Sequence, residues 1–307
     1  MSMQIGGITV KFYRTIRIPD GRSPAQLPPG LGAFPAYHVK DYRVQCPVLW
    51  EDNGIFIPMH DKEAMWLSFH CANPRALLIG AGNVNAITGK QLTPKLESPQ
   101  NYIVVPPQPW LDGWKDTDGV IYQFVAIEYK GGQGLTVGEQ ILGKECKTGG
   151  IGIAVFALKD KTITATKPFH ENAVAGIYDS SPFKGGYTGT TCCAMSTPQT
   201  RGKGFTEYGL GKGGKIAQKI YPDPYGLDAW ETELESSMAI YFVNADSFKE
   251  ITGLQVPPPP PGYQDYAGPY FTLPDTEMVD VQGTAIFAGL KSVFTESEAA
   301  EEKDTQA

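Results

Sequence analysis

Short apolar segments recur along the chain between clusters of Gly, Pro and Asn, and this pattern predicts β-strands. A strand or one helical turn fits residues 131–143, and a single helical turn fits residues 247–253. No long segment has helical periodicity, so we expect an all-β protein of packed antiparallel sheets, a β-sandwich, with few short helices. The predicted strands are residues 8–18, 54–58, 64–71, 76–82, 101–106, 120–129, 150–158, 236–244 and 284–294.

Two segments share a short motif that suggests an internal duplication. Residues 87–94 (ITGKQLTP) and 251–258 (ITGLQVPP) both read I-T-G-x-Q, then an aliphatic residue, then a Pro two positions further on. Shared turn chemistry, in which Thr-Gly ends an element, is the favoured explanation, because short matches are weak evidence of a repeat. If the duplication is real, the chain has four parts: a Pro-rich N-terminal strand and arm (1–35), a first β-sandwich unit (36–160), a second β unit (161–294) and a disordered acidic tail (295–307).

Composition and charge exclude several classes of protein. Of the 307 residues, 41% are hydrophobic and 19% are charged, which is typical of a globular chain. The net charge is −7, but residues 296–304 alone hold five acids and one Lys, so the body is near neutral and no nucleic-acid partner is expected. The N-terminus has no signal pattern, and no run approaches the roughly 18 apolar residues of a membrane span. We therefore expect a soluble, cytoplasmic protein with no membrane partner.

The cysteines and histidines form no recognisable catalytic or metal-binding motif. Five Cys without a C-x-x-C pair argue against a disulfide framework and a zinc site. Cys192 and Cys193 are interpreted as reduced thiols, with a strained vicinal disulfide as the alternative. His70 and Cys71 would point to opposite faces of a strand. We expect no metal and no cofactor, and no residue is assigned a catalytic role.

Residues 209–216, GLGKGGKI, resemble a phosphate-binding loop but lack its last element. Ile216 stands where the motif needs a Ser or Thr for Mg²⁺, and Pro222 and Pro224 stop any following helix after about two turns. We interpret the glycines as flexible turn residues and Lys212 and Lys215 as solvated. The segment is therefore predicted to be a mobile lid or a partner-binding loop.

Two aromatic loops carry the candidate ligand-binding residues. PPQPWLDGW (106–114) and KIYPDPYGLDAW (219–230) combine aromatic rings with carboxylates, a mixture that sugar sites use. Anchoring of the loops on the sheet is the competing interpretation, and Asp112 with Asp223 as a carboxylate pair for glycoside hydrolysis is another. The candidate ligand-binding residues are Trp110, Asp112, Trp114, Tyr221, Asp223, Tyr225 and Trp230.

Several blocks resemble an uncharacterised family of soluble bacterial and fungal proteins. The blocks are PPGLGAFPAYHVKDY, PQNYIVVPPQPWLDG, QFVAIEY with VGEQILGKE, QKIYPDPYGLDAW and EITGLQVPPPPPGY, within residues 28–270. This resemblance implies no activity, cofactor or catalytic residue. The Gly- and Lys-rich segments 130–133 and 184–215 depart from the family and would be lineage-specific loops.

These observations favour a non-enzymatic β-sandwich module for interaction or self-assembly. Its concrete form is a homo-oligomer, or a complex with a protein partner, joined through the Pro-rich segments 21–35 and 256–262 by exchange of arms. The first alternative is a carbohydrate-binding protein that uses the two aromatic loops. The second is a hydrolase that uses the carboxylates of the same loops.

Overall fold

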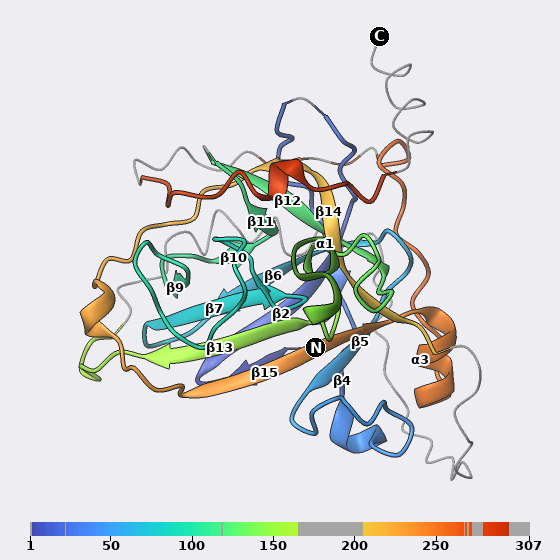
Figure 1. Cartoon of the computed structure of the whole chain (residues 1–307), viewed down its shortest axis with the longest axis horizontal. Coiled ribbons are helices and arrows are strands. Elements are labelled where there is room, and N and C mark those ends of the chain that lie inside the picture. Colours follow the sequence, from blue (N-terminus) through green and yellow to red (C-terminus); the bar gives the residue numbers. More distant parts are fainter. Residues whose placement is uncertain are drawn as a thin grey trace.

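The computed structural model describes residues 2–21, 23–117, 119–164, 205–266, 268, 270, 271 and 279–294, and strands dominate it (Figure 1). The all-β prediction is confirmed. The helices are α1 (Val137–Leu142) and α3 (Ala245–Thr252), with 3₁₀ turns η1 (Val39–Tyr42), η2 (Gly143–Glu145), η3 (Leu227–Ala229) and η4 (Phe287–Gly289). The strands are β1 (Met3–Ile5), β2 (Ile8–Thr15), β3 (Gly30–Ala33), β4 (Tyr37–His38), β5 (Ile55–Pro58), β6 (Ala64–His70), β7 (Arg75–Ala81), β8 (Val84–Asn85), β9 (Ile103–Val105), β10 (Trp110–Leu111), β11 (Gly113–Lys115), β12 (Val120–Glu128), β13 (Ile151–Ala157), β14 (Glu207–Ala217) and β15 (Ser236–Val243).

Hydrogen bonds join these strands into one sheet, in the order β1-β2-β6-β12-β14-β15-β13-β7-β8. Neighbours along this path are antiparallel, and β5 pairs with β15 in parallel. β14 pairs with β12 along most of its length but with β15 only through Glu207 and Tyr208, so the sheet turns there. A division into the separate sheets of a β-sandwich stays a prediction, as do the duplication and the boundaries of its units.

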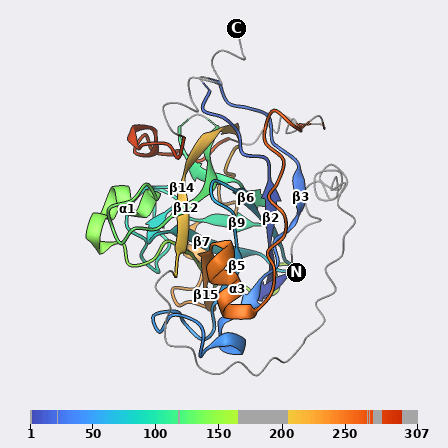
Figure 2. The same cartoon turned by 90° about the vertical axis from the view of Figure 1, so that its right-hand side faces the viewer.

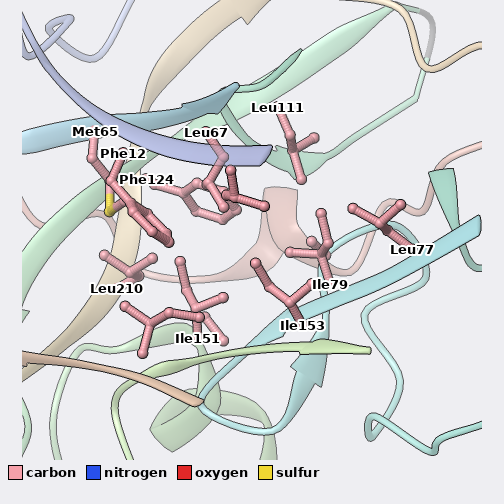
Figure 3. Packing of buried hydrophobic residues seen from close by; sticks show 14 of the residues in the cluster. Phe12, Met65, Leu67, Leu77, Ile79, Leu111, Phe124, Ile151, Ile153 and Leu210 are labelled. Atoms are coloured by element: carbon pink, nitrogen blue, oxygen red, sulfur yellow. The ribbon is translucent and has the colours of Figure 1, made fainter. Parts of the chain in front are cut away.

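The main core lies between the two halves of this sheet (Figure 3). On one side are apolar side chains of β2, β6 and β12, such as Phe12, Leu67 and Phe124; on the other are those of β7 and β13, such as Ile79 and Ile153. All five are at most 4% exposed. At about 25 cal/mol per Å² of apolar surface, this burial is the main force that holds the halves together.

The Gly- and Lys-rich residues 209–216 are not a mobile loop, which corrects the prediction. They lie inside β14, and α1 packs beside that strand (Figure 2). Between the pairs Tyr122↔Lys215 and Phe124↔Lys212, β14 has one more residue than β12, so Gly213 and Gly214 form a β-bulge. At Gly214 a Cβ atom would collide with the backbone carbonyls of Ile18 and Pro19, so only glycine permits this approach.

Lys212 is buried, not solvated as predicted. Its ammonium lies 4.7 Å from the centre of the Tyr122 ring and donates to the carbonyl of Ala288 at 3.1 Å. Burial lowers the pKa of Lys212 below its usual value. The aliphatic stem of Lys212 therefore packs inside the protein while its ammonium finds polar partners. For this reason a basic, glycine-rich segment can form a strand of the sheet.

Two other predictions need comment. Residues 284–294 contain the turn η4 and, after it, an isolated bridge of Ser292 to Lys212, and not the predicted strand, although Phe287 and Val293 are buried. None of the helices among the described residues is long and apolar enough to cross a membrane. The predicted acidic tail 295–307 and the pair Cys192–Cys193 lie outside the described residues.

Candidate functional site

The two aromatic loops lie side by side and are joined by buried glutamine side chains. Gln108 donates from Nε2 to the carbonyls of Trp110 (3.0 Å) and Lys219 (3.3 Å). Its Oε1 accepts from the backbone N–H of Tyr221 at 2.9 Å. Gln108 is only 2% exposed, so it satisfies three backbone groups of the interior. The two loops therefore lie together because Gln108 hydrogen-bonds to the backbone of both.

Asp112 is part of the same joint. Its Oδ2 accepts from Gln218 Nε2 at 2.6 Å, while its backbone N–H donates to Gln218 Oε1 at 3.1 Å. The carboxyl is fully buried, and this burial raises the pKa of Asp112 to about 7, with the Gln218 bond acting in the opposite direction. A pKa near neutrality suits a general acid or base. Here, however, the residue is 2% exposed and its carboxyl faces the Gln218 amide in the interior.

Asp223 organises its own loop. One carboxylate oxygen accepts from both Tyr102 Oη and Trp230 Nε1, each at 2.7 Å. The other accepts from the backbone N–H of Tyr225 at 2.8 Å, and Gln100 Oε1 accepts from the N–H of Asp223 itself. With three donors on its two oxygens, Asp223 holds the turn closed and is poorly placed to bind a sugar hydroxyl.

The tryptophans of both loops are packed in the interior. Trp110, Trp114 and Trp230 are 7%, 0% and 2% exposed, and Trp114 packs against Phe124 and Phe287 with ring centres 5.1 and 5.3 Å away. A sugar could stack on these rings only if the loops opened. Tyr221 is also buried, and Tyr225 is half-buried with its ring edge-on to Trp230. Trp110, Trp114 and Trp230 belong to three different buried clusters, so the structure uses the predicted site residues as loop anchors and does not gather them into one site.

A different region has the properties of a contact surface, namely residues 43–50, here called the apolar loop. It follows η1 and is the blue segment near β4 in Figure 1. Val44, Val48 and Leu49 are 77%, 80% and 86% exposed, respectively. Three large aliphatic side chains so exposed within six residues form a concentrated apolar patch, unlike isolated surface hydrophobics.

The apolar loop is held in shape by Arg43. Its guanidinium donates to the carbonyls of Trp50 (2.6 Å), Cys46 (3.4 Å) and Pro47, and pairs with Asp52 at 3.1 Å. Arginine presents five donors in a rigid fork, so one side chain satisfies several carbonyls of a tight loop. The exposed side chains are therefore presented on a fixed backbone.

Inward-pointing residues anchor the apolar loop on the sheet. Cys46 and Trp50 belong to a buried cluster with Phe56 and Tyr241. The rings of Trp50 and Tyr241 are stacked, with centres 4.5 Å apart and planes at 7°. This stack fixes the loop against β15, because offset aromatic pairs add to the burial energy.

Hollows lie on both sides of the apolar loop. One, of about 590 Å³, is lined by the loop itself together with Asp52. The other, here called the β15 groove, has a volume of about 420 Å³ and runs between Leu49 and the outer face of β13 and β15. Small residues, Gly150, Gly152 and Ala239, are part of its lining. The groove therefore offers space beside an exposed apolar side chain.

Glu207, at the start of β14, is one of several polar residues that line the β15 groove; the others are Glu51, Asn83, Glu145, Lys147 and Thr148. Its carboxylate accepts from Thr148 Oγ1 at 3.0 Å, from the N–H of Gly149 at 3.1 Å and, at 3.4 Å, from Trp50 Nε1. Burial raises the pKa of Glu207, and these donors lower it in part. Because the oxygens already have donors on the protein, Glu207 ties the groove wall to Trp50.

The thiols of the described residues are not set up for catalysis. Cys46, Cys71 and Cys146 are free and buried, and burial raises their thiol pKa values to about 12, 12 and 11. A thiol of this kind is not ionised at neutral pH and is a poor nucleophile. Nor does the described part of the chain contain a group of three His, Cys, Asp or Glu that could hold a metal ion.

Comparison of the chain with models of protein families, with curated proteins and with solved structures finds no match. The resemblance to an uncharacterised family stays a prediction. Sequence reasoning assigned nothing to residues 43–50. The one available signal was that Val44, Val48 and Leu49 lie on either side of Pro47 outside the predicted strands. Such a pattern does not distinguish a core segment from an exposed one.

Proposed function

We propose that the protein is a non-enzymatic β module that self-associates through the apolar loop. The observation that carries this proposal is the exposure of Val44, Val48 and Leu49 on one short segment. Exposed apolar side chains at this density are costly in water and mark surfaces that become covered by another molecule.

Rigidity of the loop supports the proposal. Side chains that must first be ordered lose conformational entropy on binding, which weakens association. Arg43 fixes the backbone of the loop, and the Trp50–Tyr241 stack fixes its base. A second molecule therefore meets a preformed surface.

A second copy of the chain is the occupant that we propose. Each copy carries both a protruding aliphatic patch and, beside it, the β15 groove of about 420 Å³ with small residues in its lining. A two-fold axis near the loop would place Leu49 of one copy at the groove of the other and repeat the contact in reverse. The same surface thus carries both a protruding side chain and a groove to receive it, as the interface of a symmetric dimer requires.

Exchange of the N-terminal arm is less well supported than contact through the loop. Leu27, Leu31 and Phe34 are buried against their own chain, and Leu27 exchanges two backbone hydrogen bonds with Phe271. β3 also pairs with β2. An exchanged arm would have to break all of these contacts before it formed the same ones elsewhere, so the loop is the simpler contact.

The carbohydrate-binding and hydrolase alternatives gain no support from the geometry. The stacking faces of the tryptophans are packed, Asp112 is paired with Gln218, and Asp223 has three protein donors. A binding or catalytic role for these loops would need a large rearrangement. We therefore retain the interaction module as the proposed function.

Sedimentation equilibrium over a wide concentration range tests the proposal. We expect a reversible dimer for the native chain and at least a tenfold weaker association for the double variant Val48→Ser, Leu49→Ser, which is about 1.4 kcal/mol. Val279→Ser is the matched control, because Val279 is 74% exposed but lies elsewhere in the sequence. A monomeric native chain, or equal association of the native chain and the double variant, contradicts the proposal.

A further inference from the structure

The chain continues from α3 into a run of five prolines, Pro257 to Pro261, which is followed by Gly262 and Tyr263. This segment passes over the outside of β2, as the orange trace in Figure 2 shows. Proline fixes φ near −65° and keeps the residue before it extended. Consecutive prolines therefore favour a polyproline II helix, whose backbone polar groups face outward. The segment of residues 257–263 is here called the proline strap.

The first part of the strap is held by two side chains of the body. His60 Nε2 lies 2.7 Å from the carbonyl oxygen of Pro257, and Arg14 Nη2 donates to that of Pro258 at 2.7 Å. Arg14 is fixed in turn by an ion pair of 2.5 Å with Glu63, whose side chain is 1% exposed. These contacts of His60 and Arg14 hold the first part of the strap in one orientation.

In the second part of the strap, Pro260 and Pro261 are half-buried. Gly262 and Tyr263 are exposed, and Tyr263 is 40% exposed. A cavity of about 430 Å³ is lined on one side by residues 259–265 and on the other by residues 60–64 with Arg17. A space therefore lies between the protein body and the part of the strap that contains Pro260, Pro261 and Tyr263.

Residues 260–263 read Pro-Pro-Gly-Tyr, a Pro-Pro-x-Tyr sequence. We propose that the proline strap is a docking motif for a small polyproline-binding domain of the WW type. Such a domain takes extended prolines in a groove lined by aromatic side chains, and the preformed helix costs little entropy to bind. The tyrosine adds a large apolar ring with a hydroxyl at its end.

The flanking sequence favours this class over domains that also read a basic residue. Residues 254–266 contain no Lys or Arg and include Asp265. Recognition must therefore come from the prolines and from Tyr263. The strap is separate from the apolar loop, so this inference does not depend on self-association.

Isothermal titration of the full chain with a purified WW domain that binds Pro-Pro-x-Tyr peptides tests the inference. We expect saturable binding to the native chain, and at least a tenfold loss for Tyr263→Ala and for Pro261→Ala. Leu254→Ala is the matched control, since Leu254 is 38% exposed just before the prolines, and it should change the affinity less than twofold. Thermal unfolding of each variant checks that the fold is intact.

Three outcomes would overturn the inference. The first is the absence of binding to the native chain when a free peptide of residues 254–266 binds the same domain. The second is equal binding of the native chain and Tyr263→Ala. The third is tighter binding of an SH3 domain than of the WW domain, with no effect of Tyr263→Ala.

Discussion

Residues 209–216 and residues 43–50 show how little average polarity says about burial in this protein. The first segment, GLGKGGKI, is Gly or Lys at six of eight positions, yet it lies in the mostly buried strand β14. The second, RVQCPVLW, is largely apolar, yet it exposes Val44, Val48 and Leu49. One segment is buried because its glycines let other backbones approach. The other is exposed because an arginine and two inward anchors hold it outside the sheet.

The difference teaches that backbone demands can outweigh side-chain hydrophobicity. β14 supplies hydrogen bonds to β12 across a bulge, and its missing side chains make room for Ile18, Pro19 and Gly149. The apolar loop satisfies its own carbonyls through Arg43. Since buried backbone groups need partners, a segment that the sheet needs is buried whatever its polarity.

The largest expected effect concerns a charge in the buried interior. Asp112→Asn should raise stability by up to about 4 kcal/mol above pH 7, because the pKa of Asp112 is raised to about 7 from 3.8 and one unit corresponds to ~1.36 kcal/mol. The folded state keeps its proton between about pH 4 and 7, whereas the unfolded chain has lost it. The native chain should therefore lose stability as pH rises through that window.

Urea unfolding of the native chain and Asp112→Asn at several pH values measures this effect. The two stability curves should run parallel below about pH 4, separate between about pH 4 and 7, and run parallel again above pH 7. The amide of the variant can still accept from Gln218, so the joint between the loops is kept. A constant difference across the whole range would show that the pKa of Asp112 is the same in the folded and the unfolded chain, so that burial does not raise it.

A smaller effect is expected where β14 meets the backbone of another segment. Gly214→Ala places a Cβ against the carbonyls of Ile18 and Pro19, so we expect a loss of about 2–3 kcal/mol in the free energy of unfolding. Gly289→Ala is the control, because nothing lies within 4 Å of the Cβ that it adds. Equal midpoints of urea unfolding for the two variants would refute a buried β14.

The smallest effect on stability is expected in the apolar loop. Arg43→Ala removes the donor to the carbonyls of Cys46, Pro47 and Trp50, and should cost about 1–2 kcal/mol. Association should weaken as well, because the loop loses its fixed shape. Arg43→Lys keeps the charge but not the planar fork, so it should recover only part of either loss. Full recovery by Lys would mean that charge alone matters.

Most of the fold follows from local sequence. Segments such as residues 120–129 and 150–158 are strands in the structure, as β12 and β13, because β-branched and aromatic residues recur between turn signals. The short helix at residues 245–252 also follows a recognisable signal: Asn244 caps it by accepting from the N–H of Ser247, and Gly253 ends it with a positive φ of 72°.

The failures have a physical cause in contacts that are distant in sequence. Nothing near Gly214 shows that Ile18 and Pro19 will lie against it, so β14 reads as a loop. Proximity of the two aromatic loops was considered, but the glutamines that join them, Gln108 and Gln218, carry no local signal. The candidate site at residues 43–50 was missed because exposure depends on Arg43 and on the sheet, which the local pattern does not encode.

Hydrogen–deuterium exchange at low and high protein concentration tests the central claim most directly. The account predicts slow exchange at both concentrations for the amides of β14 that point toward β12, since they are hydrogen-bonded within the sheet. The amides of Val44, Val48 and Leu49, the exposed residues of the apolar loop, should gain protection as concentration rises and the loop is covered. The amides of Cys46 and Trp50 already donate to Tyr42 and Pro47 and should be protected at both concentrations. Fast exchange throughout β14, or exchange of the exposed loop residues that is independent of concentration, would contradict the account.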